Sequence, residues 1–566
     1  MEQNEKTMSK ETVSEKELND NYIYGKWGPY QVVQTAISLF NIWPAGYQLL
    51  IGVFIGYRPD FQCAIPEIEN KDGKNNSIYI TYEKCHIKTF LNNTNQGRPQ
   101  LINQTTCIHG FHYSLGKHST IVTEMNLVCD RAPLAELVQT LIMAGQLVGA
   151  AFASSLADKF GRKTILLVSH LLTMTFGFGV AFSRSYITLA ILKFILGVLQ
   201  QGMVMPNAVL ALELFPERTR FYTETLGMFV WTTGLIIMAP IAYLMKDYSW
   251  RYLQIALTCF SLFSLVQYWV QDESLRWLAA NGKKEEADRV IRKVAKWNKL
   301  NYEDLRKIVE GKMALTKTVS VQQIEDKKSD QLYQKSDLPL VEKYSFLTIL
   351  RNKNIFAISL IMWFTWVTNT LTYFGLTLTS TRLAGDRFLN FFLSSFVEYI
   401  AVILTHVMLL CLGRRAITII FHAICGVSLA SATILNYFAG HNSALQTLSV
   451  VTTFVGKMAI AGSFSTLFLY TPELYPTNLR NVGIGFSSAF ARIGGILSPF
   501  AGTLAEEIPW VPGTIFSVMC FIVTLLILCV PETRGTELPQ SLIEVKLWYT
   551  ENSGIHKRNK TMNTKL

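Results

Sequence analysis

Four ionisable side chains stand well inside long apolar stretches of this sequence: Lys193, Glu398, Lys457 and Arg492. A charge at the centre of a bilayer costs roughly 2.5–3.5 kcal/mol, so each of them needs a partner or a watery surrounding. Side chains of this kind bind an ion of opposite charge or tie two helices together. The chemistry that they indicate is binding.

Catalysis has little support in the sequence. It contains no nucleotide-binding loop, no histidines at metal-ligand spacing and no nucleophile motif, and His170, His406 and His422 are isolated. The net charge of +11 could fit a nucleic-acid binder, but the basic residues stand mostly in short connections and one central loop, as membrane topology requires. We expect no enzyme, no cofactor, no metal and no nucleic-acid partner.

Arg492 lies on a small, polar helix face with Gly485, Ser488, Gly495 and Pro499, at i−7, i−4, i+3 and i+7. About eight large apolar residues at roughly −0.5 kcal/mol each nearly cancel against one arginine, so this helix stays in the membrane only if the charge faces the interior. Contact with a substrate and a simple pairing with another helix are both open.

Glu398 has the same design. Ser394, Ser395, Ala401 and Thr405 share its helix face, and large aromatic and branched side chains lie away from it. An internal ion pair between Glu398 and Arg492 is one interpretation, and contact with a substrate is the other.

The apolar stretches that hold these charges are predicted to be helices that span a membrane. Half of the 566 residues are hydrophobic and 16% are charged, against about 25% charged in average globular proteins. Twelve apolar runs have close to the ~20 residues that cross a bilayer. They cover about 28–54, 134–157, 164–182, 186–211, 222–245, 250–270, 355–376, 387–410, 415–438, 445–470, 481–504 and 510–530.

The orientation follows from the connections. Those between spans 2–3, 4–5, 8–9 and 10–11 hold eight basic residues, and those on the other side hold five, which predicts cytosolic termini. The loop at 55–133 carries Cys63, Cys85, Cys107 and Cys129, which predicts two disulfides with three possible pairings. Sequons at Asn75, Asn92 and Asn103 predict a glycosylated, extracellular loop.

The chain repeats itself. The segment ELYPTNLR from Glu473 to Arg480 follows ELFPERTR, from Glu213 to Arg220, by 260 residues. Three further pairs keep nearly the same offset: Gly161-Arg162 with Gly413-Arg414, Glu273 with Glu532, and Lys193 with Lys457. This pattern predicts two homologous halves.

The connections carry motifs of a known family. The residues Asp158-x-x-Gly161-Arg162-Lys163 resemble the signature of the major facilitator superfamily. More narrowly, residues 119–130, Trp363-Phe-Thr, 473–480 and 531–535 resemble the organic cation/anion/carnitine transporter family. Two departures are four loop cysteines where six are expected, and the lack of prolines in 271–276.

The resemblance implies an all-α membrane protein with twelve transmembrane helices in two pseudo-symmetric six-helix bundles and a large disulfide-containing extracellular loop. The expected division is an N-terminal cytosolic tail at 1–27, a first bundle at 28–270 that includes the loop at 55–133, a cytosolic central loop at 271–354, a second bundle at 355–530 and a C-terminal cytosolic tail at 531–566. We expect a plasma-membrane protein with one chain as the transport unit.

The implied activity is transport of small organic ions by alternating access. Glu398 with Arg492 looks like the family's zwitterion pattern, able to meet an ammonium and a carboxylate together. Trp366 and Tyr373, seven residues apart on one face, would be walls for a quaternary ammonium, although such spacing usually means packing. Lys457 and Lys193 complete the expected substrate-binding set.

The repeated motifs predict gates, because their acidic and basic residues can form ion pairs between the halves that break when one face opens. The expected gating residues are Asp158, Gly161, Arg162, Lys163, Glu213, Arg220, Arg414, Arg415, Glu473 and Arg480. Solvated loops are the alternative. A sugar porter and a non-transporting receptor are the rival functions, and four buried charges argue against the first.

Overall fold

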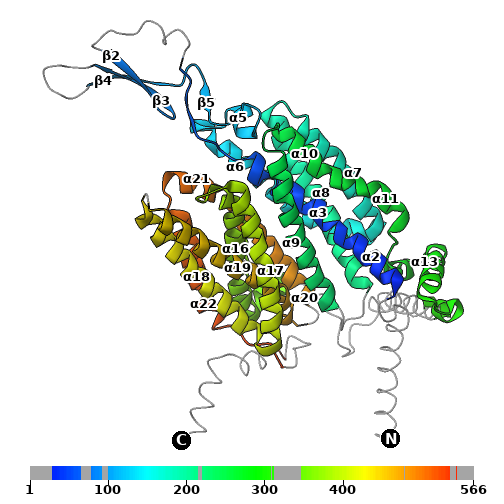
Figure 1. Ribbon diagram of the computed structural model, residues 1–566. Helices are drawn as coiled ribbons and strands as arrows, with labels where there is room; N and C mark the ends of the chain where they lie inside the picture. The colour runs from blue at the N-terminus through cyan, green and yellow to red at the C-terminus, as the bar shows by residue number, and fades with distance from the viewer. Residues whose placement is uncertain are drawn as a thin grey trace, which may run out of the picture.

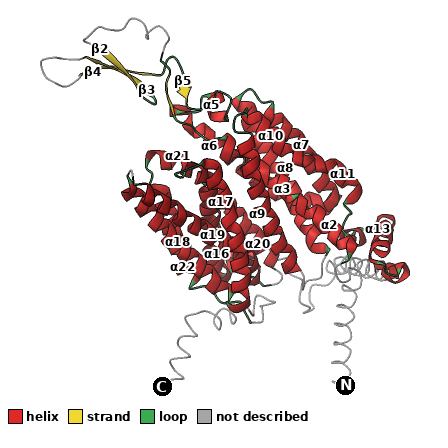
Figure 2. Ribbon diagram, in the orientation of Figure 1, coloured by secondary structure: helices red, strands yellow, loops and turns green. Residues whose placement is uncertain are grey.

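The protein consists of two helical bundles that lie side by side, with a small β-structure projecting from one end (Figures 1 and 2). The computed structural model describes residues 28–65, 78–91, 100–214, 220–307, 309–310, 346–440, 442–476, 479–535 and 544. We call the end with the β-structure the sheet end and the opposite end, where helix α13 lies, the α13 end.

The first half contains α2 (Pro29–Phe40), α3 (Ile42–Leu50), α4 (Gly52–Ile55), α6 (Ala132–Phe160), α7 (Arg162–Ala181), α8 (Tyr186–Glu213), α9 (Arg220–Leu244), α10 (Trp250–Cys259), η3 (Phe260–Leu262) and α11 (Phe263–Val270). The second half contains α16 (Lys353–Thr379), η4 (Ser380–Arg382), α17 (Arg387–Cys411), α18 (Arg414–Ala439), α19 (Ser443–Glu473), α20 (Arg480–Leu497), α21 (Phe500–Glu507) and α22 (Val511–Ile527).

Ten helical segments of the described chain are long and apolar enough to cross a membrane. The last two expected spans differ from them. The span expected at 481–504 is divided into α20 and α21 at Ser498 and Pro499, where the proline lacks the N–H that would continue the helix. The final span is the shorter α22, with 17 residues.

The halves meet along two helix pairs, α9 against α17 and α6 against α20. Near the sheet end, Phe54 of α4 stacks on Phe388 and meets Phe391 edge-on, with ring centroids 5.6 and 4.9 Å apart. Gly495 of α20 faces Met143 of α6, where an added Cβ would lie 3.2 Å from the sulfur. The small face that the sequence predicts around Arg492 therefore lets α20 approach the other half.

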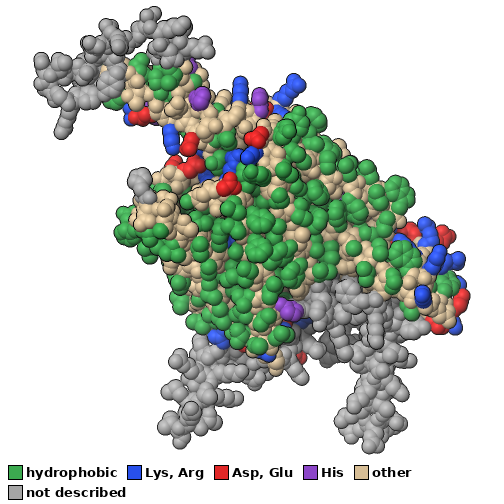
Figure 3. All heavy atoms as spheres, in the orientation of Figure 1, with side chains coloured by type: hydrophobic (Ala, Val, Ile, Leu, Met, Phe, Trp, Pro, Cys, Tyr) green, Lys and Arg blue, Asp and Glu red, His purple; other side chains and the backbone are tan. Residues whose placement is uncertain are grey.

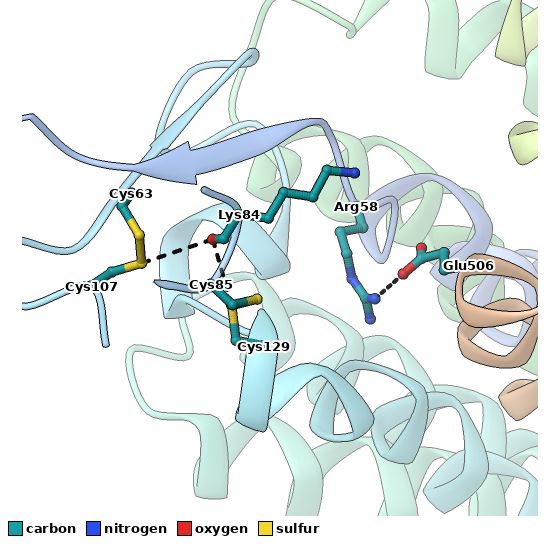
Figure 4. Close-up of a disulfide and its surroundings, with 7 residues drawn as sticks. All are labelled: Arg58, Cys63, Lys84, Cys85, Cys107, Cys129 and Glu506. Atoms are coloured by element: carbon teal, nitrogen blue, oxygen red, sulfur yellow. Dashed lines mark hydrogen bonds and ion pairs between the residues drawn. A yellow bond between two sulfur atoms is a disulfide. The ribbon is translucent and has the colours of Figure 1, made fainter. Parts of the chain in front are cut away.

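The β-structure has two antiparallel parts. Strand β1 (Phe61–Cys63) pairs with β5 (Phe111–Tyr113), and β2 (Ile78–Tyr82), β3 (His86–Leu91) and β4 (Gln100–Thr106) form a three-stranded sheet. Disulfides join Cys63 to Cys107 and Cys85 to Cys129, which selects one of the three pairings that the sequence allows. The Lys84 carbonyl lies between them (Figure 4).

The polypeptide returns from the sheet to the first half through α5 (Ile121–Met125) and η1 (Cys129–Arg131). Glu124 of α5 forms an ion pair with Arg251 of α10 at 2.6 Å, and the ring N–H of Trp250 donates to the same carboxylate at 2.7 Å. Asn103 is exposed on β4, whereas the sequons at Asn75 and Asn92 lie outside the described residues.

At the other end, α12 (Leu275–Ala280) and α13 (Lys284–Asn298) pack on the first half. Helix α13 is amphipathic, and its apolar residues form the buried face. Lys293 pairs with Asp272 at 2.6 Å. Helix α15 (Phe346–Arg351) leads into the second half, and residues 311–345 of the central loop lie outside the described residues.

Candidate functional site

Glu398 on α17 and Lys457 on α19 form a buried ion pair inside the second half. Lys457 Nζ lies 3.1 Å from Glu398 Oε1, and the two residues are 1% and 3% exposed. The ammonium also donates to the Tyr373 carbonyl at 3.2 Å and to the Thr377 hydroxyl at 2.5 Å. Lys457 is therefore held by three oxygen acceptors, as a buried cation must be.

This pair corrects one of the two sequence-based interpretations of Glu398. The glutamate was expected either to contact a substrate or to pair with Arg492, and its partner is Lys457. The reason lies in helix neighbours, because α17 packs against α19, while Arg492 on α20 faces the first half. Spacing along one helix identifies the face of a residue but not the helix opposite.

Tyr373 on α16 connects this pair to the first half. Its ring lies under Lys457, with Nζ 3.2 Å from the ring centroid, which is a cation–π arrangement. Its hydroxyl donates to Glu398 Oε2 at 3.1 Å and accepts a hydrogen bond from the ring N–H of Trp231 on α9 at 3.0 Å. A continuous chain of polar contacts thus runs from Lys457 across the seam to α9.

Trp366 is not part of this chain of contacts. It is 1% exposed, its ring N–H donates to the Thr471 hydroxyl at 2.9 Å, and its ring packs edge-on against Phe468. Phe464 touches the rings of both Trp366 and Tyr373, at 5.7 and 5.6 Å between centroids. In this structure Trp366 is a packing residue behind the ring that meets the charges.

Arg492 points across the seam into the first half. It donates to Gln146 Oε1 on α6 at 2.5 Å, and Gln146 in turn bonds to Gln200 of α8. In the described part of the chain no carboxylate lies within ion-pairing distance of this guanidinium, and its Nε has no hydrogen-bond partner. Among the described residues, the guanidinium of Arg492 therefore meets one amide oxygen, and its charge is not neutralised.

Lys193 lies apart from these residues. It lines a cavity near the sheet end, together with residues of α4, α6, α16 and α21. The structure thus brings Glu398, Lys457 and Tyr373 together, sets Arg492 at the α6–α20 contact, and places Lys193 elsewhere.

A four-residue ionic network, which the sequence pattern does not indicate, joins the halves at the sheet end. Arg58 and Glu136 come from the first half, and Arg382 and Glu506 from the second. The N···O distances are 3.6 Å from Arg58 to Glu136, 3.2 Å from Arg382 to Glu136 and 2.9 Å from Arg382 to Glu506, and Arg58 also pairs with Glu506. We call these residues the sheet-end network.

Figure 4 shows the Arg58 guanidinium directed at the carboxylate of Glu506, and Figure 3 shows charged side chains gathered at this end of the molecule. These four residues stand near the ends of spans, where a charge has little insertion cost. Their presence there therefore did not mark them as a site. The available signal was that Arg58, Arg382 and Glu506 each follow a span, and Glu136 lies near the start of one, on the same side.

The repeated motifs at the α13 end form one cluster in each half. Arg162 pairs with Asp158 at 3.0 Å and lies 3.9 Å from Glu213. Its counterpart Arg414 pairs with Glu473 at 3.3 Å. The expectation that these ion pairs join the two halves is thus corrected for this structure, because each arginine meets a glutamate at the end of a helix in its own half.

A second glutamate packs against the motif glycine in each cluster, which leaves no room for a larger residue at that glycine. An added Cβ at Gly161 would lie 2.4 Å from Glu273 Oε2, and one at Gly413 would lie 2.1 Å from Glu532 Oε2. Glu273 accepts from the backbone N–H of Lys163 at 3.0 Å. The two halves therefore repeat the same packing of glycine against a following glutamate.

Two further expected gating residues bind backbone carbonyls. Arg415 donates to the Leu528 carbonyl at 2.5 Å, and Arg480 donates to the Pro472 carbonyl at 3.0 Å. Arg220 begins α9, and its side chain is outside the described part.

Comparison with known proteins agrees with this architecture. The family model described as sugar (and other) transporter matches residues 77–542. An organic cation transporter protein of Drosophila melanogaster is 31% identical, covering 92% of each chain. The chain belongs to the organic cation, anion and carnitine transporter family of the major facilitator superfamily.

Other members of this family are similar over the same length. The human organic cation/carnitine transporter 2 is 29% identical over 92% of both chains, and mouse organic anion transporter 3 is 29% identical over 93% of this chain and 94% of its own. The solved proton:xylose symporter XylE has a TM-score of 0.57 at 15% identity, over 92% of this chain and 99% of its own, which shows the fold alone. The chain is a multi-pass membrane transporter, and these relatives do not favour the sugar-porter alternative.

Proposed function

We propose that this protein carries small organic ions with a carboxylate group, either zwitterions such as carnitine or organic anions, across the plasma membrane. The observation that carries this proposal is the guanidinium of Arg492, which lies where the halves meet and has no carboxylate partner in the described chain. A substrate carboxylate would supply that partner through a charge-assisted hydrogen bond.

The charges at the seam support a preference for anionic groups. Glu398 is already paired with Lys457, so the two of them contribute no net charge, and Arg492 leaves the set at +1. A pure cation would have to displace Lys457 from Glu398. A zwitterion could place its carboxylate at Arg492 and its ammonium near Tyr373, whose hydroxyl bonds to the acid and whose ring already meets the Lys457 ammonium.

Alternating access is supported by the unequal ends of the molecule. At the sheet end, two ion pairs join the halves, Arg58 with Glu506 and Arg382 with Glu136. At the α13 end, the pairs of Arg162 and Arg414 that the structure describes stay within one half. The structure therefore corresponds to a state closed at the sheet end, and we propose that the motif residues at 158–163, 213–220, 414–415 and 473–480 rearrange when the other end closes.

The sheet end is proposed to be extracellular, and both termini cytosolic. Two disulfides need an oxidising compartment, and the basic residues of the short connections are in excess at the α13 end. The division into bundles at 28–270 and 355–530, with a central loop at 271–354, follows from the same topology. One chain holds both halves and is proposed as the transport unit.

Uptake assays in cells test this function. Cells expressing the wild type and the Arg492→Gln, Arg492→Lys and Glu398→Gln variants are offered labelled carnitine, a dicarboxylate and tetraethylammonium. We expect uptake of at least one of the first two, a loss of about tenfold or more in Arg492→Gln, and partial retention in Arg492→Lys, because a lysine keeps the charge and loses the bidentate geometry.

Arg184→Gln is the matched control, since it removes an exposed arginine from a connection at the sheet end. Surface labelling confirms equal expression of all variants. Full uptake in Arg492→Gln would remove this residue from the site. Uptake of tetraethylammonium alone, unaffected by Arg492→Gln, would contradict the preference for carboxylates.

A further inference from the structure

A cavity of about 40 Å³ lies between the two halves near the sheet end. Glu136 and Arg382 of the sheet-end network form part of its wall, and Gln139 and Leu378, about one turn further from that end along α6 and α16, form another part. The first half also contributes Lys193. This cavity is therefore bounded by both halves and lies on the inner side of the network.

Lys193 is the unusual member of this wall. It is 2% exposed, yet it has no hydrogen-bond acceptor and no ion-pair partner among the described residues. Its repeat counterpart Lys457 shows what such a lysine normally has, namely Glu398 at 3.1 Å and two further oxygen acceptors. A buried ammonium without these partners carries a large desolvation penalty.

The acids nearby cannot compensate this charge because they are already in use. Glu136 Oε1 takes hydrogen bonds from Arg382 at 3.2 Å and from the Thr503 hydroxyl at 2.8 Å, and Glu506 pairs with both arginines of the network. The network has two arginines and two glutamates and is neutral. Adding Lys193 leaves the cavity and its wall with one uncompensated positive charge.

We propose that this cavity binds a small inorganic anion of the chloride class between the ammonium of Lys193 and the hydroxyl of Thr381. Thr381 of η4 also lines the cavity, is 5% exposed, and its hydroxyl has no partner in the described chain. One water needs roughly 10–15 Å³ of such volume, so about 40 Å³ holds one small ion with a water or two and excludes an organic substrate.

This site is separate from the proposed substrate site at Arg492, and it has a defined consequence. Its two ligands come from different halves, Lys193 from α8 and Thr381 from η4, and the wall includes network residues. The anion is therefore bound only while the sheet end is closed, and it stabilises that state.

Thermal unfolding of the purified full-length protein in detergent tests this site without any transport measurement. Chloride is titrated against gluconate at constant ionic strength. Because a ligand that binds only the native state raises stability by mass action, chloride is expected to raise the Tm of the wild type by about 3 °C or more at saturating concentration. Lys193→Gln is expected to remove the rise.

Lys246→Gln is the matched control, because Lys246 is an exposed lysine at the same end and its loss should leave the chloride response intact. Thr381→Val, which keeps the side-chain shape, is expected to raise the chloride concentration needed for half the effect by roughly 3–10-fold. If Lys193→Gln does not fold, the chloride response of Thr381→Val tests the site in its place. A wild-type Tm that is equal in chloride and gluconate, or an unchanged response in Lys193→Gln or in Thr381→Val, would overturn the proposal.

Discussion

The pair of Glu398 and Lys457 shows how a charge is tolerated in the membrane interior. Each side chain is nearly inaccessible, and each has its opposite charge and further hydrogen bonds in place. Removing one partner of such a pair leaves an uncompensated buried charge, whereas removing both does not.

We therefore expect Glu398→Gln and Lys457→Met each to lower stability by about 3–5 kcal/mol, and the double variant to lose much less than their sum. Thermal unfolding in detergent measures this cycle. Glu310→Gln is the control, since its pair with Arg306 is about half exposed and is worth at most about 1 kcal/mol. Additive losses in the double variant would show that the two residues are not coupled.

Gly161 gives a second test at this scale. Its backbone has φ +101° and ψ 145°, a region that is essentially open to glycine alone, and an added Cβ would meet Glu273. Gly413 has φ −80°, which any residue can adopt, so an added Cβ there would only clash with Glu532.

Alanine at Gly161 is expected to cost about 1–3 kcal/mol more than alanine at Gly413, because strain is added to the steric clash. The difference between the two Tm values measures this. Equal losses would mean that the clash with glutamate, which both sites share, accounts for the whole effect.

Single functional residues could be predicted where a charge is costly to insert into the membrane. Lys193, Glu398, Lys457 and Arg492 were found because a charge inside an apolar run needs an explanation. Their partners were not, since a helix pattern indicates a face and no opposite helix. Arg58 and its network stayed unseen for the opposite reason, because charges at span ends are ordinary.

At the scale of elements, the short segments at the ends of the spans decide how the halves are joined. Arg58 follows α4, Arg382 ends η4 and Glu506 lies in α21, and all of them converge with the first turns of α6. The break of the eleventh span at Pro499, which its continuous apolar pattern did not indicate, makes α21 a separate short helix that carries Glu506.

Glu506→Gln is expected to open the sheet end more often, because two arginines then share one carboxylate. Glu506 is 37% exposed, so its contribution is about 1 kcal/mol and the open population rises about fivefold. The measurement is labelling of Val53→Cys, which lines the cavity, by a membrane-impermeant thiol reagent.

The labelling experiment uses a background in which the exposed Cys259, Cys411 and Cys529 are serine. Arg184→Gln again provides the control for loss of a charge at this end. Labelling rates that are equal with and without Glu506 would show that the network does not hold the halves together.

At the scale of the whole molecule, the two-bundle architecture was predictable from the repeats. The offset of about 260 residues predicted two halves, and both halves repeat the packing of a glycine against a following glutamate at Gly161 and Gly413. The relation between the halves was not predictable. The motifs alone did not indicate that Arg162 and Arg414 would meet Glu213 and Glu473 of their own halves.

The segment at 118–124, which follows the β-structure, is attached to the first half. The His118 carbonyl and the Glu124 carboxylate accept hydrogen bonds from Trp250 and Arg251 of α10. Arg58, which precedes the β-structure, pairs with Glu506 of the second half. Burial raises the pKa of Glu124, but the hydrogen bonds from Arg251 and Trp250 and the charge of Arg251 outweigh it, so this pKa is lowered from 4.5.

A lowered pKa means that this attachment is complete above pH 4.5 and is lost as the pH falls below that value, through the pKa of the folded state. Hydrogen exchange of residues 120–131, corrected for the intrinsic rate, is expected to accelerate in that range in the wild type. Glu124→Gln should show fast exchange at neutral pH already and little change with acid. Slow exchange at every pH in both proteins would contradict a role for the carboxylate.

Attachment to one side has a mechanical result. A rocking motion of a few ångströms at the helix seam becomes a much wider swing at the tip of a rigid arm that belongs to one of the moving bodies. The strands tied by Cys63–Cys107 and Cys85–Cys129 project as an arm beyond the first half (Figure 1). An antibody fragment bound to the arm would mark its position, so that single-particle imaging can follow its displacement during each transport step.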